Sequence, residues 1–408
     1  MDQNQKAGIG QDLDVLRAES ALYRRFPRKR LEQMLESPQN CEQDIRELSG
    51  YLYLVSPCYR RLVDYLSIIL KYHYTIRPTR LPVPNPLPAD FMTEYYAVAN
   101  ACEKYCLPRE AAKAMKIAIR DGVFYGLCFE SEDSFYIRPF DPLYARITGV
   151  NGGVYRFCVN LDYFTENPKM LLDYGDNFME AYLLYKGETP KEDGKPGITG
   201  NPDYQWFEPQ NGICLKADES DLSCSLPLFT GLLLSAFDME DYKLLQKVRK
   251  VNDSYKVLSA KLETDEEGVP KMSFPTAKQY YDQIAGSLPD SVGLLLTPFT
   301  ISEVPLERSP SAGADKNPMS EKIPWFPADE SVAFSILRQF EEYFNKKIRD
   351  FSLVYGFQLK FTDQSVFNSD QFTSRLAQAV QNGLPFQMDY AVSLGVSPSD
   401  FGGMAERG

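Results

Sequence analysis

The sequence predicts an α+β protein, and three observations lead to this prediction. Amphipathic helical patterns recur in both halves of the chain. Residues 123–160 instead alternate apolar and polar side chains with the period of two that is typical of strands. The stretch from Leu226 to Leu262 begins as an apolar run and continues as a long helix with a narrow apolar stripe. The 408 residues are enough for two or more domains, or for one elongated body with subdomains.

The composition limits the classes of protein to consider. A hydrophobic content of 44% supports a folded core, and a net charge of −12 argues against a basic, tightly binding nucleic-acid surface. This net charge does not exclude a protein that lets nucleic acid slide past without binding it tightly. Eight scattered cysteines and no signal peptide predict free thiols in a reducing cytoplasm. The best apolar run, Leu226 to Phe237, is shorter than the roughly twenty residues that span a membrane.

The N-terminal quarter is predicted to be helical before it becomes extended. Residues 1–25 are polar and form a loosely held arm, followed by a short helix around Leu31 to Leu35 and another from Asp44. Pro57 suits the first turn of a third helix. Residues 72–81 alternate and are expected to be extended. The inward face of the third helix is expected to comprise Tyr59, Leu62, Val63, Leu66, Ile69 and Leu70.

The middle of the chain is predicted to hold two helices followed by strands. Residues 82–88 contain four prolines and form a rigid connector. Helices are expected near 90–105 and 109–121, and strands between 123 and 160 with a turn at Asn151-Gly152-Gly153. Residues 186–202 are a surface loop. A hairpin around Asn211-Gly212 is expected to join Trp206-Phe207 to Ile213–Leu215.

A helix from Asp238 to Leu262 would extend roughly 37 Å at 1.5 Å per residue. Asp238 is the predicted N-cap, and the acidic residues Asp238, Glu240 and Asp241 suit the positive end of the helix dipole. The apolar stripe repeats at spacings of four and three, which is typical of a helix that packs against a neighbouring helix. Its residues are Leu244, Val248, Val251, Tyr255, Leu258 and Leu262.

The remaining elements follow from prolines and alternation. An acidic loop at 263–268 precedes a short helix within 274–289 and two strands within 292–306, broken at Pro298. Four prolines between 308 and 328 exclude a continuous helix there. A helix capped by Asp329 is expected to reach about Phe351. A strand near 357–361, a helix over 369–381 and a last short helix near 388–394 complete the chain.

The sequence offers little that supports catalysis. His73 is the only histidine, so a Ser-His-Asp or Cys-His set would need it, and its place between tyrosines favours a structural hydrogen bond. Cys102 and Cys106 lack the further ligands of a zinc site. Neither of the glycine-rich phosphate-binding motifs occurs. We therefore expect no enzymatic activity, no cofactor and no metal; the alternative is an enzyme with a small-molecule site on the 123–160 strands.

Five segments, in order, resemble the portal proteins of tailed bacteriophages, the head-to-tail connectors. Residues 48–74, with the core Ser-Pro-Cys-Tyr-Arg-Arg-Leu-Val, resemble the amino-terminal wing helix, and 114–164 resemble the wing body. Residues 226–258 resemble the first stem helix with its lead-in, and 274–304 the clip. Residues 367–404 resemble the carboxy-terminal wing.

The resemblance implies a portal-type fold with a helical and stranded wing, a long stem helix and a small α/β clip. The implied regions are an arm and wing (1–225), a lead-in and stem helix (226–262), a clip (263–308), a connector (309–328) and a second long helix with the C-terminal wing (329–408). One departure concerns the second stem helix of such portals. It is either displaced onto 329–351 or shortened or missing.

The function implied by the resemblance is a homo-oligomeric ring, a dodecamer, at one capsid vertex of the virion, assembled in the host cytoplasm. Its partners would be the terminase large subunit, the major capsid or scaffold protein, head-completion or adaptor proteins, and double-stranded DNA passing non-specifically through the channel. The helical stripe would then be the ring-packing seam. Lys243, Lys247, Lys250 and Lys256 would face either the channel or solvent. Another phage structural protein, an adaptor or baseplate component, is the further alternative.

Overall fold

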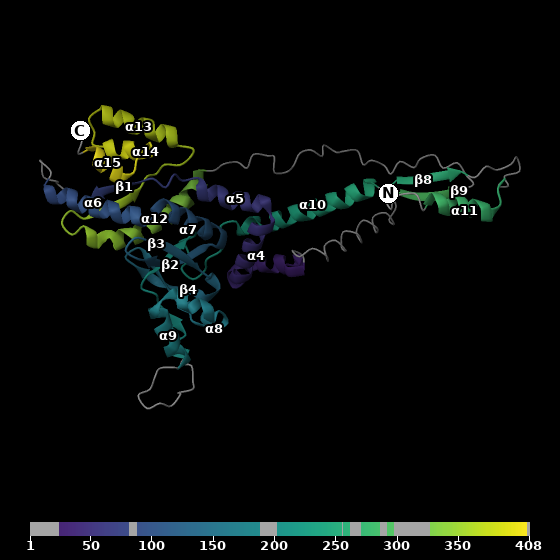
Figure 1. The fold of residues 1–408 in the computed structure, drawn as a ribbon, viewed down its shortest axis with the longest axis horizontal. Coiled ribbons are helices and arrows are strands. Elements are labelled where there is room, and N and C mark those ends of the chain that lie inside the picture. The colour runs from purple at the N-terminus through teal and green to yellow at the C-terminus, as the bar shows by residue number, and fades with distance from the viewer. Residues whose placement is uncertain are drawn as a thin grey trace. The chain divides into compact units, whose positions relative to one another are not determined.

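The computed structural model describes residues 24–80, 88–187, 202–254, 256–261, 271–285, 292–297 and 327–405. It is a mixed helical and β-sheet structure, as the α+β prediction requires. The chain divides into two compact units (Figure 1). One, here called the body, comprises Lys29–Ala236 and Phe326–Gly408. The other, the inserted unit, comprises Phe237–Trp325 together with the first 28 residues.

Three helices open the described chain: α3 (Arg28–Glu36), α4 (Glu42–Val55) and α5 (Pro57–Ile68). Pro57 stands in the first turn of α5, where its missing N–H costs no hydrogen bond. Of the predicted inward face, Tyr59, Val63 and Leu66 are buried and Leu62 is half-buried. Ile69 and Leu70 are buried too, but they follow the end of the helix at Ile68. The chain then extends into β1 (Tyr74–Pro78), which pairs antiparallel with β10 (Phe357–Phe361) near the other end of the chain.

Helices α6 (Ala89–Lys104) and α7 (Leu107–Asp121) lead into the first sheet, as predicted. In this sheet β2 (Val123–Glu130) lies between β3 (Phe135–Phe140) and β7 (Gly212–Lys216), and both pairings are antiparallel. Helix α7 ends at Gly122, whose φ of 81° is the left-handed conformation that favours glycine. A Cβ there would lie 2.2 Å from the carbonyl oxygen of Leu226, so this position requires glycine.

The second sheet has the order β4-β5-β6, with β4 (Ala145–Asn151) and β5 (Val154–Asn160) joined by the predicted turn. Three helical segments that the sequence did not predict follow: α8 (Asp162–Glu166), η3 (Pro168–Tyr174) and α9 (Asp176–Lys186). Figure 1 shows α8 and α9 beside β4. Their aromatic residues share one core with the two sheets, which includes Tyr125, Phe157, Phe164, Tyr174 and Phe178.

The predicted hairpin around Asn211-Gly212 is wrong. Strand β6 (Trp206–Phe207) pairs with β5, whereas β7 pairs with β2 in the other sheet. The connection crosses between sheets because Asn211 is held at the end of β2. Its carbonyl accepts a hydrogen bond from the Cys128 amide at 2.9 Å, and its side chain donates one to the Cys128 carbonyl at 2.7 Å.

The C-terminal part of the body begins with α12 (Pro327–Ile348), the predicted long helix, which packs against α7 and β7. The predicted cap is wrong, because the helix already begins at Pro327 and Asp329 lies inside its first turn. After η6 (Arg349–Phe351) come β10, α13 (Ser369–Gln381) and α14 (Gln387–Ser393), as expected. An additional helix, α15 (Pro398–Ala405), was not predicted. Figure 1 shows α13, α14 and α15 grouped together near β1.

The inserted unit contains a helix and a small parallel α/β element. Helix α10 (Leu233–Ser254) is followed by β8 (Lys256–Lys261), α11 (Phe274–Ala285) and β9 (Val292–Thr297). Strands β8 and β9 pair in parallel, from Lys256 opposite Val292 to Lys261 opposite Thr297. Parallel neighbours need a crossover connection, and α11 lies within it. This unit is therefore a long helix that leads into a β-α-β element.

The predicted extent of the long helix was wrong at both ends. Helix α10 begins at Leu233, after the turn η5 (Thr230–Leu232), so Asp238 lies inside the helix and does not cap it. It ends at Ser254, after Asn252 and Asp253, and all three are residue types of low helix propensity. Strand β8 begins at Lys256.

Several predictions lie wholly or largely outside the described residues. They concern the N-terminal arm, the proline connector at 82–88, the loops at 186–202 and 263–268, the strand after Pro298 and the connector at 309–328.

Candidate functional site

The predicted seam and channel residues are only partly on one helix. Helix α10 carries three residues of each set, Leu244, Val248 and Val251 of the seam and Lys243, Lys247 and Lys250 of the lysines. Leu258 and Lys256 lie on β8, so their assignment to the helix is wrong. Tyr255 and Leu262 lie outside the described residues. On α10 the predicted seam is therefore a shorter stripe of three residues, Leu244, Val248 and Val251, at positions i, i+4 and i+7.

The two sets of α10 positions are offset by one residue, which separates them by about 100° around a helix of 3.6 residues per turn. Lys243 is exposed and forms an ion pair with Glu240 at 2.6 Å, at the helical spacing of three. An exposed pair of this kind contributes little stability. Leu244, its neighbour in the chain, is partly buried. In this one pair the residue of the stripe, Leu244, is less exposed than the lysine, Lys243.

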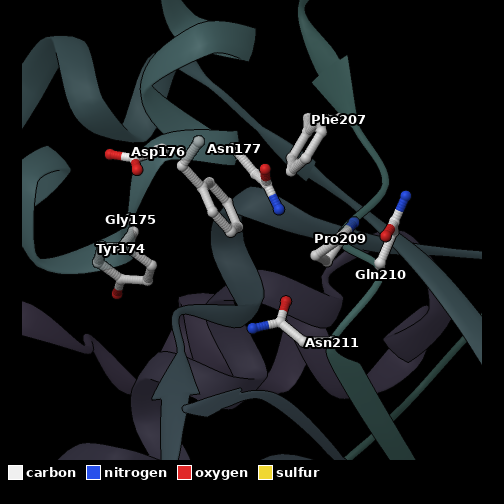
Figure 2. A pocket seen from close by; sticks show the side chains of 9 residues that line it. Tyr174, Gly175, Asp176, Asn177, Phe207, Pro209, Gln210 and Asn211 are labelled. Atoms are coloured by element: carbon white, nitrogen blue, oxygen red, sulfur yellow. The ribbon is translucent and has the colours of Figure 1, made fainter. Parts of the chain in front are cut away.

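A small hollow of about 240 Å³ lies between the start of α9 and residues 207–211 (Figure 2), and none of its lining residues belongs to the 123–160 strands on which the alternative enzyme would have its site. Figure 2 shows the amides of Asn177 and Asn211 approaching it from opposite sides, with Phe207 and Pro209 beside them. Gly175, with a φ of 89°, turns the chain into α9 at its edge. Its remaining lining residues are Tyr174, Asp176, Phe178 and Gln210.

This hollow offers hydrogen bonds but little else. Carboxamides donate and accept hydrogen bonds, but they are neither proton acceptors for general base catalysis nor nucleophiles. Asp176 is in the first turn of α9, where the helix dipole already favours a carboxylate. Asn211 is used to hold β2, as described above. The arrangement can orient a small polar group, and it lacks a paired nucleophile and base.

A larger hollow of about 840 Å³ adjoins it and contains three cations, each of which already has a partner. Arg156 pairs with Glu208, Lys346 donates to the carbonyl of Asn151, and Lys347 pairs with Glu130 at 2.7 Å. Arg156 and Lys347 are therefore paired with carboxylates, whereas Lys346 is hydrogen-bonded to a neutral carbonyl and keeps its positive charge.

A third hollow, of about 780 Å³, lies along α12 between Ser331 and Glu342. Phe334 and Tyr155 contribute aromatic surface to it, and Glu219, Glu342 and Asp363 contribute three carboxylates. Arg338 is its single arginine, and it lies 3.4 Å from Asp363. The sequence did not indicate this hollow, because its residues come from four separate parts of the chain, 150–155, 219, 331–342 and 363–368.

His73 has the structural role that the sequence indicated. Its Nδ1 lies 3.1 Å from Oε1 of Gln364, and burial lowers the pKa of the imidazole, although this hydrogen bond opposes the shift. A neutral imidazole held in this way joins the β1 region to the segment after β10.

The eight cysteines are free thiols. Burial raises the pKa of Cys102 to about 12 and that of Cys128 to about 11, so both are protonated at neutral pH and poorly reactive. Among the described residues, no three His, Cys, Asp or Glu side chains gather as a metal-binding group would. No helix in the described part of the chain has both the length and the apolarity needed to cross a membrane.

Neither protein-family models nor curated proteins give a match to this chain.

Proposed function

We propose that this chain is a portal protein of a tailed bacteriophage. In this proposal, copies of the chain form a homo-oligomeric ring, a dodecamer by the resemblance given above, around a channel at one capsid vertex. Double-stranded DNA passes through the channel during packaging and ejection, and the ring joins head to tail. The chain itself has no enzymatic activity.

The observation that carries this proposal is the interruption of the body. The body is built from residues on both sides of the inserted unit, 29–236 and 326–408. Between them the chain runs through the 22-residue helix α10, about 33 Å long at 1.5 Å per residue, and then through the β8-α11-β9 element. A wing that is interrupted by a stem helix and a small α/β clip has this order of elements. The regions implied by the resemblance, 226–328, cover nearly the same span.

The charge of the chain is compatible with a channel for DNA. Proteins that hold DNA tightly neutralise phosphates with clustered lysine and arginine, and each such contact would slow passage. The chain instead has 56 acidic residues and 44 lysines and arginines. A net charge of −12 suits a channel that confines DNA without binding it.

Partners follow from the proposed assembly. The clip, β8-α11-β9, would contact the terminase large subunit during packaging and head-completion or adaptor proteins later. The body would contact the scaffold or major capsid protein.

The direct test is the mass of the purified chain. Native mass spectrometry and negative-stain microscopy should show one closed ring with a mass many times the 46.5 kDa of the chain. A monomer that persists over a wide range of concentration and salt would refute the proposal. A reproducible thermal shift with ATP, a divalent metal or a sugar would favour the alternative of an enzyme.

A further inference from the structure

We propose that one face of the body is a contact surface for the phosphate backbone of double-stranded DNA, bound without regard to sequence. This surface, here called the basic stripe, is formed by the solvent-facing cations of α7 and by one arginine of α5. It belongs to the body and not to α10, so the inference goes beyond the proposed channel and does not depend on a ring. The residues of the basic stripe are Arg60, Arg109, Lys113, Lys116 and Arg120.

The four cations of α7 lie on one side of the helix. They occupy positions i, i+4, i+7 and i+11, and residues at these spacings are neighbours along one helical face. From Arg109 to Arg120, their side chains are 67%, 35%, 40% and 31% exposed. The only two carboxylates of the helix, those of Glu110 and Asp121, are 2% and 9% exposed. Helix α7 therefore presents its cations to solvent and holds its acids beneath them.

The fold keeps these two carboxylates in place. Glu110 accepts a hydrogen bond from the amide of Ile137 on β3 at 3.0 Å, and it also pairs with the first two cations of the helix. Asp121 accepts two hydrogen bonds of 2.6 Å from Arg120. A guanidinium has five N–H groups and an ammonium has three, so each cation keeps donors for a further acceptor on its solvent side.

Three cations of the basic stripe converge around the ring of Tyr53 on α4. The guanidinium carbons of Arg60 and Arg120 lie 5.5 Å and 5.7 Å from the ring centroid, and Nζ of Lys116 lies 5.5 Å from it. Asp64 pairs with Arg60 at 3.6 Å and with Lys116 at 2.6 Å, and it accepts a hydrogen bond from the Tyr53 hydroxyl at 2.8 Å. Two cations that share one carboxylate leave one positive charge in excess.

The basic stripe is a local excess of positive charge on an acidic chain. Its five cations are set against the three carboxylates of Asp64, Glu110 and Asp121, of which Asp64 is the most exposed at 33%. Beside it on α4, Arg46 is hydrogen-bonded to the carbonyl of Asp121 and is paired with Glu42, so this pair adds no net charge. The net charge of −12 describes the whole chain and not this face.

The excess of positive charge continues just before the start of α7. Lys104 and Lys347 share the single carboxylate of Glu130, at 3.0 Å and 2.7 Å. The exposed acids Glu132 and Asp133, in the turn that follows β2, mark its limit at this end.

A DNA duplex is the partner that these observations favour. Arg109 and Arg120 are eleven residues apart, roughly 16 Å along the helix at 1.5 Å per residue, which is the length of about five phosphates of one DNA strand. A row of cations along a helix is typical of a surface that binds nucleic acid. An acidic peptide would instead need a pocket for an anchoring side chain, and no residue of the basic stripe lines any of the three hollows described above.

The first test is the salt dependence of binding. The full chain is titrated into a short fluorescein-labelled duplex, and binding is followed by fluorescence anisotropy. With about four phosphates contacted, the affinity should fall roughly 100-fold between 50 and 200 mM salt, and duplexes of unrelated sequence should bind equally. An absence of binding at about 50 mM salt would overturn the inference.

The second test removes the three most exposed cations of the basic stripe, in the variant Arg60→Gln/Arg109→Gln/Lys116→Gln. The slope of log affinity against log salt should become shallower by about three, one for each lost phosphate contact. Circular dichroism shows whether the variant is folded. The single variant Arg109→Gln, at the most exposed of these positions, should lower the slope by about one and tests the same contact with the least change to the fold.

The matched control changes the net charge of the body by the same amount at exposed positions of η3, β10 and α13. It is Lys169→Gln/Lys360→Gln/Arg375→Gln, and it should bind the duplex like wild type. If the variant of the basic stripe and this control bind alike, the contact lies elsewhere and the inference is wrong. A duplex that only enters a channel would give this result.

Polyglutamate tests the choice of partner. An extended polyglutamate chain has one charge per roughly 3.4 Å, against one per about 1.7 Å of duplex. At equal concentration of charge it should therefore displace the labelled duplex less effectively than unlabelled duplex does. Equal or better displacement would identify an acidic protein, and not DNA, as the partner.

The outcomes separate this inference from the proposed function. If wild type forms rings but loses no affinity for DNA when the basic stripe is neutralised, this inference is wrong while the portal proposal stands. If wild type stays monomeric but binds DNA through the basic stripe, the portal proposal is wrong while this inference stands.

Discussion

Gln339 provides a sharp test of how the two segments of the body are joined. It lies on α12 with only 7% of its surface exposed, and its side chain meets the peptide of Lys216 on β7. Its Oε1 accepts from the Lys216 amide at 2.8 Å, and its Nε2 donates to the Lys216 carbonyl at 2.9 Å. Strand β7 is an edge of its sheet, so this amide occupies the place that a further strand would take.

The substitution Gln339→Met preserves length and removes these bonds. It leaves the Lys216 N–H and C=O without partners in a buried site, and each orphaned group costs about 1–3 kcal/mol. A third hydrogen bond, from Nε2 of Gln339 to Glu219 at 2.8 Å, is lost as well, but Glu219 still accepts a hydrogen bond from the Ser335 hydroxyl. The total loss is therefore about 2–6 kcal/mol, a large fraction of the roughly 5–15 kcal/mol by which a domain is stable.

The assay is urea denaturation followed by far-UV circular dichroism. Gln339→Met should shift the midpoint of unfolding of the body to lower urea without changing the slope. The matched control is Gln378→Met, at an exposed position of α13, which should change the free energy of unfolding by less than about 0.5 kcal/mol. If both variants unfold like wild type, the Gln339 amide does not join α12 to the sheet.

Two further predictions concern α10 and pH. Val251→Asp, on the predicted seam of α10, should prevent ring formation because a buried, unpaired carboxylate costs several kcal/mol in every subunit. Lys250→Glu, which is not on the seam, should still form the ring when its mass is measured by light scattering. If Val251→Asp assembles like wild type and Lys250→Glu does not, the seam has been assigned to the wrong face of α10. Burial lowers the pKa of His73 below its usual 6.5, so the unfolded chain takes up this proton more readily than the folded one. The body should lose stability as pH falls below about 6.5, and His73→Gln should unfold with a smaller dependence on pH between 7 and 5; an unchanged dependence would contradict this.

The sequence by itself determined most of the local structure. Pro57, the alternation of 123–160 and the turn at Asn151-Gly152-Gly153 act over a few residues, through fixed backbone angles and the two-residue period of a strand. The elements that they predict are the ones found, α5 and β2 to β5. The same reasoning failed at residue 254, where a stripe with helical spacing continued into a segment that also alternates. A segment that fits both periods is decided by its partner, and here the partner of β8 is β9.

Tertiary structure alone decided which strands pair and which side chains are exposed on the surface. Nothing in Trp206–Lys216 indicates that β6 and β7 join different sheets, because the deciding bonds are made by Asn211 to a distant strand. The loop after η6 is similar: Leu353 and Val354 are ordinary apolar residues in the sequence, and in the structure they are exposed while Glu94 and Arg80 bond the peptide groups behind them. The hollow along α12 gathers residues from four parts of the chain. Short-range preferences fix which residues form helices and strands, whereas long-range packing fixes which side chains the body buries and which it leaves exposed.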